Sequence, residues 1–298
     1  MKIAIIGSQG FVGAHCYSYF EQNNEVWGAD ISNKLAQQNF FPVEREHTDF
    51  GIIFHEHEFD LCINASGNGL VSKSLESPLF DYELNVFNTI KILECIRTKQ
   101  PSCRFINLSS AAVYGNPETL PVQESSPLNP ISPYGWHKRY GEEICTEYWK
   151  LHGIRSLTLR IFSLYGENLR KQLFWDIYQK TCESKRIILF GTGDETRDFL
   201  YIRDLMQVFS RVILASSFEA EALNVAAGVE ISIRTAAELF CQALDPTIEI
   251  TFNGNTKKGD PSNWRADISK LQRMGFAPEY TFEQGIKHVA QWILREKR

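Results

Sequence analysis

Short apolar runs alternate with longer amphipathic segments through roughly the first 160 residues of the chain. The apolar runs have the length of buried strands and occupy residues 2–6, 25–29, 61–64, 104–108 and 156–159. Between them lie stretches long enough for helices, an order typical of βαβ units around a parallel sheet. The sequence therefore predicts an α/β fold.

Two of the intervening segments have clear helical patterns. In residues 79–98, apolar side chains recur every three or four positions, as on the buried face of a helix. They are Leu84, Phe87, Ile90, Leu93 and Ile96. A second helix is predicted over residues 134–151, because Ser132 can cap its first amides and Pro133 is tolerated in the first turn. Tyr134 then lies at the start of this helix.

A glycine motif follows directly on the first predicted strand. Gly7, Gly10 and Gly13 form a GxxGxxG spacing, and an amphipathic segment that starts with Phe11 and Val12 overlaps it. Glycines permit a tight turn and let a pyrophosphate approach the positive end of a helix. The motif predicts a dinucleotide site, although an ordinary tight turn is the alternative that the spacing alone leaves open.

Asp30 ends the second predicted strand, twenty positions after Gly10. A carboxylate there can accept hydrogen bonds from both adenosine ribose hydroxyls and would repel a 2′-phosphate. NAD is therefore the expected cofactor. A plain loop aspartate is the alternative for Asp30, and Lys34 nearby leaves NADP as the less favoured cofactor.

A YxxxK motif joins Tyr134 and Lys138, which share one face of the predicted helix. A phenol is a poor base at neutral pH until a nearby positive charge favours the phenolate, and Lys138, joined by the positive nicotinamide ring, can provide that charge. Ser109 and Ser110 follow the fourth predicted strand at the carboxyl edge, where doubly wound sheets bind ligands. The serine hydroxyl can hold a reacting oxygen for Tyr134. By itself YxxxK also fits a partly buried tyrosine beside a surface lysine.

These motifs and several others resemble the nucleotide-sugar epimerase/dehydratase branch of the extended short-chain dehydrogenases/reductases. The likeness covers essentially the whole chain. Besides the glycines and YxxxK it rests on NLSSAAVYG at 107–115, SPYG at 132–135, LRIF at 159–162, YG at 165–166, GTG at 191–193, RDF at 197–199, NVA at 224–226 and ADI at 266–268. The resemblance implies a Rossmann-type doubly wound parallel sheet in residues 1–160. Residues 161–298 would form mainly a smaller, partly interleaved substrate domain, with some segments returning to the sheet domain.

The resemblance also implies roles for individual residues. The implied catalytic residues are Ser110, Tyr134 and Lys138. The implied cofactor contacts are Gly7, Gly10, Phe11, Val12, Gly13, Asp30, Asp49, Phe50, Ala65, Ser66, Gly67, Asn85, Ser109, Tyr134, Lys138, Ile161 and Phe162. The implied substrate contacts are Ser110, Tyr134, Ser163 and Arg197. A guanidinium such as that of Arg197 can hold a diphosphate with two parallel hydrogen bonds.

The reaction implied by the resemblance is NAD-dependent epimerisation of a nucleotide-linked sugar at C4 through a transient keto intermediate. The related 4,6-dehydratases carry an Asp-Glu pair where this chain has Ala111 and Ala112, so dehydration is disfavoured. Many epimerases have asparagine where this chain has Ser163, which leaves an NAD(P)H-dependent 4-keto-sugar reductase as the alternative. A non-catalytic dinucleotide-binding protein is less favoured, because the catalytic trio is complete.

Composition limits the other partners. The formal net charge of −5 gives no overall reason to expect nucleic acid or an anionic membrane. No stretch approaches roughly 18 uninterrupted apolar residues, and the opening run is shorter than a signal-peptide core, so a cytoplasmic protein is expected. Seven scattered cysteines without CxxC spacing indicate reduced thiols, and His55 and His57 lack companion ligands, so no metal is expected. The family commonly dimerises through two helices, here residues 79–98 and 134–151, and a homodimer is expected.

Overall fold

The computed structural model describes residues 1–45, 48–255 and 261–296. It divides into two compact units. The first unit comprises Met1–Gly115, Pro127–Ile161 and Val212–Asn224. The second comprises Asn116–Ser126, Phe162–Arg211 and Val225–Arg298.

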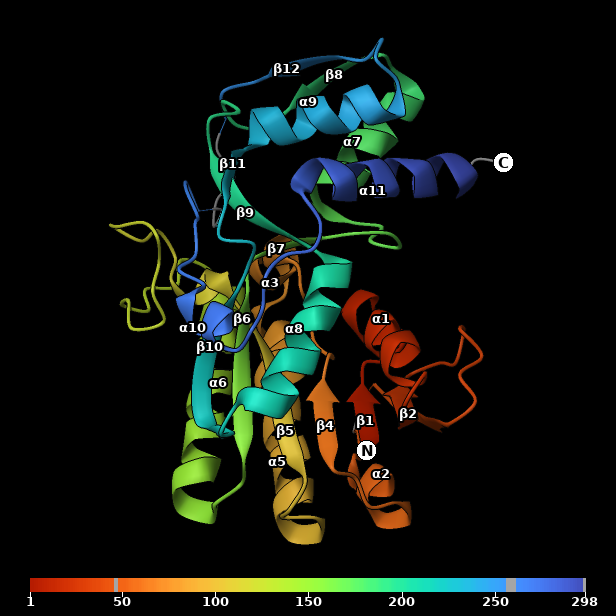
Figure 1. Cartoon of the computed structure of the whole chain (residues 1–298), viewed down its shortest axis with the longest axis vertical. Coiled ribbons are helices and arrows are strands. Elements are labelled where there is room, and N and C mark those ends of the chain that lie inside the picture. The colour runs from red at the N-terminus through yellow and green to blue at the C-terminus, as the bar shows by residue number, and fades with distance from the viewer. Residues whose placement is uncertain (46–47, 256–260, 297–298) are drawn as a thin grey trace. The chain divides into compact units, whose positions relative to one another are not determined.

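A seven-stranded sheet forms the centre of the first unit, in the order β3-β2-β1-β4-β5-β6-β10 (Figure 1). The neighbouring pairs from β3 to β6 are parallel. The strands are β1 (Lys2–Ile6), β2 (Glu25–Asp30), β3 (Phe40–Pro42), β4 (Leu61–Asn64), β5 (Arg104–Ser110), β6 (Ser156–Ile161) and β10 (Glu219–Val225). The strand order reverses between β1 and β4, and doubly wound sheets bind ligands at the carboxyl ends of the strands at such a point.

The predicted Rossmann-type α/β class is confirmed, and so are the five predicted strands. Two of them match their predicted bounds and three extend one or two residues further. The sequence did not predict the short edge strand β3 or the strand β10. β10 comes from a distant part of the chain and pairs next to β6, and its last residue, Val225, belongs to the second unit.

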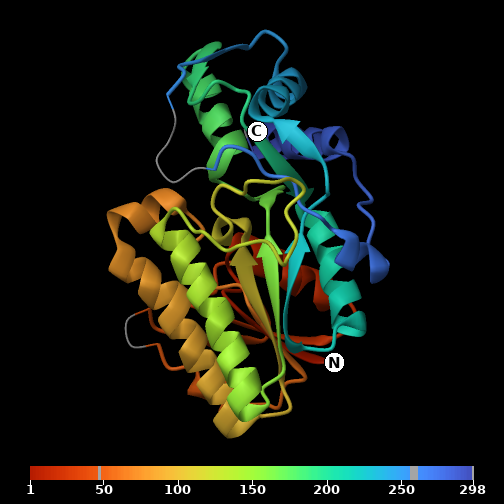
Figure 2. The ribbon, with the colours of Figure 1, turned by 90° about the vertical axis from the view of Figure 1, so that its left-hand side faces the viewer.

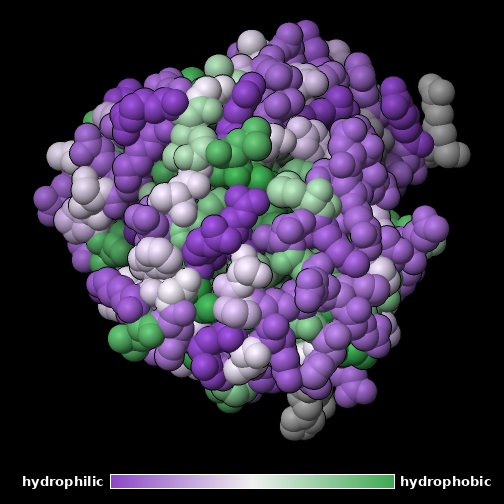
Figure 3. Space-filling view, turned by 60° about the horizontal axis from the view of Figure 1, so that its bottom comes forward, coloured by the Kyte–Doolittle hydropathy of each residue, from purple (hydrophilic) through white to green (hydrophobic). Residues whose placement is uncertain are grey.

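Helices cover both faces of this sheet. On one face α2 (Gly51–Glu56), α5 (Asn88–Lys99) and α6 (Pro133–His152) enclose an apolar core with the strands. Figure 2 shows α5 and α6 side by side along that face. On the opposite face lies α1 (Phe11–Phe20), and α3 (Val71–Glu76) and α4 (Pro78–Tyr82) precede α5 in the chain. Figure 3 shows that hydrophilic side chains cover most of the face at the amino ends of the strands.

The single helix predicted over residues 79–98 is instead interrupted. A π-helical turn, Glu83–Phe87, separates α4 from α5. Because a π-turn takes one residue more than an α-turn, it rotates the buried face. Leu93 and Ile96 are buried as predicted, but Phe87 is 49% exposed, and Asn85 and Val86 point inward in its place. The predicted face is therefore wrong in its first half.

The predicted start of α6 is confirmed. Ser132 has extended backbone geometry, and its hydroxyl accepts a hydrogen bond from the amide of Gly135 at 3.2 Å, as an N-cap does. Pro133 occupies the first turn, and Gly153 ends the helix in a left-handed conformation. This cap fixes Tyr134 in the first turn of α6.

The second unit is built from two small sheets and five helices or helix segments among its described residues. The sheets have the orders β11-β9-β7 and β12-β8. The strands are β7 (Ser163–Tyr165), β8 (Arg186–Leu189), β9 (Thr196–Tyr201), β11 (Glu230–Ser232) and β12 (Glu249–Phe252). The helices are α7 (Gln172–Glu183), α8 (Ile202–Ala215, whose end belongs to the first unit), α9 (Ile233–Leu244), α10 (Ser269–Arg273) and α11 (Phe282–Glu296). In the part of the chain that the structure describes, no helix is both long and apolar enough to span a membrane.

Candidate active site

The glycine motif forms a tight connection between β1 and α1. Gly7 has φ +82°, and a Cβ built on it would lie 2.6 Å from the amide nitrogen of Ser66. A Cβ on Gly13 would lie 2.1 Å from the carbonyl oxygen of Gly7. Side chains are therefore excluded where the turn meets the start of α1 and the loop after β4.

The N-terminus of α1 carries no capping side chain from any described residue, and no acidic residue lies in its first turn. Phe11 and Val12 occupy that turn and are partly exposed. Unpaired amides at a helix start attract anions such as phosphate. The loop thus offers the space and the polarity that a pyrophosphate needs.

Asp30 lies at the end of β2, beside the glycine motif. One carboxylate oxygen accepts a hydrogen bond from the amide of Gln9 at 2.9 Å, and the other accepts one from the amide of Ile31 at 2.7 Å. A carboxylate has about four acceptor positions, so both oxygens retain capacity for a further donor. Asp30 is therefore held rigidly next to the turn with its acceptor role intact.

The loop after β4 brings three further predicted cofactor residues to the same edge. The amide of Ala65 donates to the carbonyl of Ile6 at 2.8 Å, which continues the β1–β4 ladder. Ser66 donates its amide and hydroxyl to Asn64, and Gly67 has φ +108°. The predicted residues Ala65–Gly67 therefore lie directly against the glycine turn.

Asn85 reaches this loop from the π-helical turn. A Cβ on Gly67 would lie 2.4 Å from Asn85 Oδ1, so only glycine leaves room there. Asn85 Oδ1 is buried and accepts no hydrogen bond from any residue that the structure describes. A buried acceptor without a donor costs about 1–3 kcal/mol, so this atom marks a place where a ligand donor would be stabilising.

Ser110, Tyr134 and Lys138 lie together at the carboxyl end of β5. The Ser110 hydroxyl oxygen accepts from the amide of Ala112 at 3.2 Å, and the Ser110 side chain lowers the pKa of the neighbouring Tyr134 phenol. Lys138 Nζ lies 5.7 Å from the Tyr134 ring centre and donates to the carbonyl of Leu108 at 2.9 Å. The structure thus brings the three predicted catalytic side chains into one cluster.

Burial dominates the electrostatics of Tyr134. It raises the pKa of the phenol to about 12, the hydrogen bond from Ser110 opposes this rise, and the charge of Asp81 adds to it. The phenol is therefore protonated at neutral pH. Positive charge in addition to Lys138 is needed before Tyr134 can act as a base.

Ser109 belongs to a buried polar network that the sequence did not predict. Its hydroxyl donates to Glu142 Oε1 at 2.5 Å, and Glu142 also pairs with the guanidinium of Arg160 at 2.7 Å. The Arg160 guanidinium also donates to the Tyr114 hydroxyl oxygen at 2.8 Å, and that hydroxyl donates to Asn224 Oδ1 at 2.6 Å. The Ser109 hydroxyl is therefore used inside the protein, and only its backbone is left for the predicted cofactor contact.

Three other predicted residues differ in what they expose. Asp49 is exposed and accepts from the amide of Gly51 at 2.7 Å, whereas the Phe50 side chain packs in the core. Only the backbone of Phe50 is available to a ligand. Ile161 ends β6 with 9% of its surface exposed. Of the three, only Asp49 has an exposed side chain that a ligand could contact.

Phe162, Ser163 and Arg197 belong to the second unit. Ser163 begins β7, and Arg197 lies in β9 with its guanidinium 5.5 Å from the ring centre of Trp264. Arg197 also donates to the carbonyl of Ser262 at 3.2 Å. Stacking and hydrogen bonding hold this guanidinium in place.

The neighbour of Arg197 has a structural role that the motif did not reveal. Asp198 is fully buried and accepts hydrogen bonds from the amides of Ala227, Gly228 and Ala266 at 2.9–3.1 Å. Burial raises the pKa of Asp198 to about 6, although these amide donors counteract the rise. Asp198 thus connects three segments of the second unit beside Arg197.

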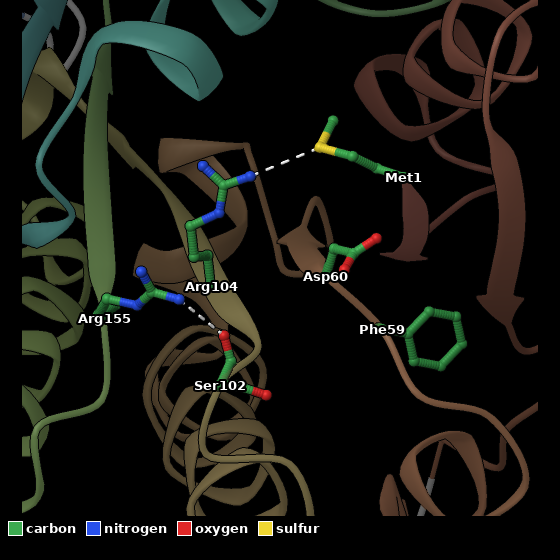
Figure 4. Close-up of a pocket in the computed structure, with 6 residues that line it drawn as sticks. All are labelled: Met1, Phe59, Asp60, Ser102, Arg104 and Arg155. Atoms are coloured by element: carbon green, nitrogen blue, oxygen red, sulfur yellow. Dashed lines mark hydrogen bonds between the residues drawn. The ribbon is translucent and has the colours of Figure 1, made fainter.

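A cavity of about 450 Å³ lies at the opposite edge of the main sheet, where β4 and β5 begin. Figure 4 shows its lining: Met1, Phe59, Asp60, Ser102, Arg104 and Arg155. Arg155 donates to the carbonyl of Ser102 and Arg104 to the sulfur of Met1. None of the predicted site residues lines it. Within residues 1–45, 48–255 and 261–296, no group of three or more His, Cys, Asp or Glu side chains could hold a metal ion.

Comparison with known proteins identifies the family of this chain. The model of the NAD dependent epimerase/dehydratase family matches residues 3–226. A putative UDP-glucose 4-epimerase of Methanocaldococcus jannaschii is 29% identical, over 99% of this chain and 99% of its own length. A dTDP-glucose 4,6-dehydratase of Xanthomonas campestris is 27% identical, over 81% of this chain and 74% of its own length.

A solved structure shares the fold. The UDP-glucuronic acid 4-epimerase of Bacillus cereus, in complex with UDP-glucuronic acid and NAD, superimposes with a TM-score of 0.90 at 24% identity. The match covers 99% of this chain and 100% of that chain.

Proposed function

The chain belongs to the NAD-dependent epimerase/dehydratase family, whose cofactor is NAD, and we propose that it epimerises a nucleotide-linked sugar at C4 through a transient keto intermediate. The observation that carries the proposal is the cluster of Ser110, Tyr134 and Lys138 at the sheet edge that also holds the glycine turn. Relatives named as 4-epimerases support the choice of reaction.

The residues of this edge fit a dinucleotide. Gly7 and Gly13 leave room for it, the start of α1 suits its pyrophosphate, and Asp30 suits its adenosine ribose. Asn85 Oδ1 offers an acceptor that no described residue uses. When bound, NAD supplies a reversible two-electron oxidant for the carbinol carbon of the sugar.

Tyr134 is the proposed proton carrier. In the oxidative half it accepts the proton of the sugar hydroxyl, and in the reductive half it returns a proton to the keto oxygen. Ser110 donates a hydrogen bond to the phenol oxygen, and the Lys138 ammonium stabilises the phenolate. Burial raises the pKa of Tyr134 and keeps the proton on the phenol at neutral pH, whereas Ser110 and Lys138 act in the opposite direction and favour the phenolate.

The residues after Ser110 argue against dehydration. Ala111 and Ala112 are buried and form a short 3₁₀ turn, so they supply neither acid nor base to eliminate water. Ser163 supports the alternative of an NAD(P)H-dependent 4-keto-sugar reductase, because a hydroxyl holds substrate differently from an amide. Arg197 is the proposed contact of the substrate diphosphate, since Trp264 stacking already orients its guanidinium.

We also propose that the protein is a homodimer formed through the two predicted segments, residues 79–98 and 134–151, at the surface of α4 and α6. Their surface exposes large apolar and aromatic side chains, and Tyr140 lies 5.9 Å from Trp136 and 6.5 Å from Tyr82 between ring centres. Leu79 is 70% exposed on the same unit. Aromatic side chains are enriched in interfaces, so burial against a second copy would remove this apolar surface from water.

A substrate panel tests the proposed reaction. The purified protein is incubated with UDP-, GDP-, CDP- and dTDP-sugars, with and without added NADH or NADPH. Interconversion of C4 epimers without added cofactor supports the epimerase. Stoichiometric consumption of reduced cofactor with a keto sugar would instead establish the reductase, and no conversion of any sugar by NAD-loaded protein would contradict both.

A further inference from the structure

Asp81 is a fully buried carboxylate close to the proposed site, and neither the sequence motifs nor the proposed mechanism uses it. It lies in α4 and accepts three side-chain hydrogen bonds: from Asn68 Nδ2 at 2.6 Å, Asn85 Nδ2 at 3.1 Å and His137 Nδ1 at 2.5 Å. These donors come from the loop after β4, the π-helical turn and α6. One carboxylate thus joins three elements that carry proposed cofactor and catalytic residues.

The carboxylate fixes the orientation of the Asn85 amide. An ionised carboxylate only accepts hydrogen bonds, so the NH₂ group of Asn85 must face Asp81. The amide oxygen therefore points away, into the space that Gly67 leaves free of a side chain. This explains why Asn85 Oδ1 is buried without a donor from the described residues.

The same carboxylate fixes His137. This residue lies on α6 between Tyr134 and Lys138, and it is 8% exposed. Because Asp81 accepts, His137 donates from Nδ1, which sets the rotation of its ring. Tyr82 packs edge-on against that ring at 5.4 Å between centres. The segment of α6 that carries the YxxxK motif is therefore attached to α4 at its buried side.

We propose that Asp81 is a positioning residue with two effects. Through Asn85 it orients a hydrogen-bond acceptor toward the dinucleotide, and through His137 it fixes the position of the YxxxK segment of α6. This inference rests on the proposed function, because it takes the dinucleotide to bind beside Asn85 and Gly67. The ligand group that meets Asn85 Oδ1 is an N–H or O–H donor of the dinucleotide. Asp81 itself touches neither cofactor nor sugar.

The test measures NAD affinity by calorimetry and, separately, kcat and KM for the sugar. Asp81→Asn keeps the shape of the side chain but lets Asn85 turn its NH₂ group toward the ligand. A flipped Asn85 amide would leave the ligand donor facing another donor in a buried site, and the cost of that unpaired donor predicts a rise of about 10–100-fold in the Kd for NAD. Loss of the Asp81 charge lowers the pKa of Tyr134, but the displaced YxxxK segment should outweigh this, so the kcat should fall while the KM for the sugar changes little. Thermal unfolding should stay cooperative. Glu83→Gln, an exposed carboxylate on the same turn, is the matched control and should leave Kd and kcat unchanged.

A second pair of variants keeps the test decisive if Asp81→Asn does not fold. His137→Asn retains a donor near the Nδ1 position, whereas His137→Leu removes it. We expect His137→Asn to restore the Kd and kcat that His137→Leu loses. The inference would be overturned if the two His137 variants had equal Kd and kcat, or if a folded Asp81→Asn variant had unchanged Kd and kcat. NAD binding by the wild-type protein would in either case leave the proposed function standing. A wild-type protein that binds no NAD would overturn the proposed function and this inference with it.

Discussion

Gly13→Ala tests whether the close turn after β1 is the cofactor site. A Cβ at this position would lie 2.1 Å from the carbonyl oxygen of Gly7, where ordinary contact requires about 3.4 Å, and 2.9 Å from Ser8 Cα. Both neighbours are backbone atoms, so the turn or the start of α1 must move by about 1 Å. Such overpacking typically costs 1–3 kcal/mol, and the better helix propensity of alanine returns about 1 kcal/mol. We expect a net loss of up to about 2 kcal/mol.

The larger effect of Gly13→Ala should be on the affinity for NAD. A ligand present at about 100 times its Kd stabilises a folded protein by roughly 2.7 kcal/mol, and a tenfold weaker Kd removes about 1.4 kcal/mol of this. A displaced turn no longer presents its amides to the pyrophosphate, so we expect at least a tenfold weaker Kd. Thermal unfolding with and without NAD measures both effects in one experiment.

Gly141→Ala is the matched control. Gly141 also lies in a helix, α6, but a Cβ there would meet its nearest atoms at 3.6 Å, which is ordinary contact. This variant should be as stable as the wild type or up to about 1 kcal/mol more stable, with unchanged NAD stabilisation. The reasoning fails if Gly13→Ala shows the same NAD-induced stabilisation as the wild type and Gly141→Ala.

Three further predictions concern the catalytic tyrosine, the buried ion pair and the thiols. Tyr134→Phe should bind NAD with unchanged affinity in calorimetry, yet its kcat should fall by at least about 10²–10⁴-fold, because only the proton-transfer group is lost. Full turnover by this variant would refute the mechanism. Glu142→Ala leaves a buried arginine unpaired and should lower the free energy of unfolding in urea by about 3–5 kcal/mol. The exposed Glu143→Ala should change it by about 0.5 kcal/mol or less, and equal losses would contradict the assigned network. Cys182 is exposed, so a thiol reagent should modify it before the buried cysteines of the native protein, and faster labelling of Cys16 or Cys145 would show that the core is wrongly described.

Local patterns were enough to predict the main strands and the start of α6. The strand 61–64 follows the polar Asp60, has an apolar centre and ends at the polar Asn64, so hydropathy alone predicts its extent. Ser132 and Pro133 specify the first turn of α6 through chemistry confined to neighbouring residues. Predictions of this kind need no knowledge of distant contacts.

Long-range pairing explains what the sequence did not predict. β10 joins the sheet beside β6 although about sixty residues separate them in the chain, and no local pattern specifies such a pairing. The π-turn at Glu83–Phe87 rotates Asn85 inward, which a regular helical period cannot anticipate. The contact of Asp81 with His137 spans 56 positions, and only the packing of α4 against α6 creates it. A polar residue inside an apolar helical segment was the available signal for Asp81.

Isotope retention tests the central claim most directly. A nucleotide sugar that carries deuterium on C4 is incubated with the NAD-loaded protein in ordinary water, without added cofactor, and the epimer formed is analysed by mass spectrometry and NMR. Oxidation and reduction at C4 within one site predict that the epimer keeps its deuterium at C4. An epimer that has lost the deuterium to water would contradict the proposed mechanism.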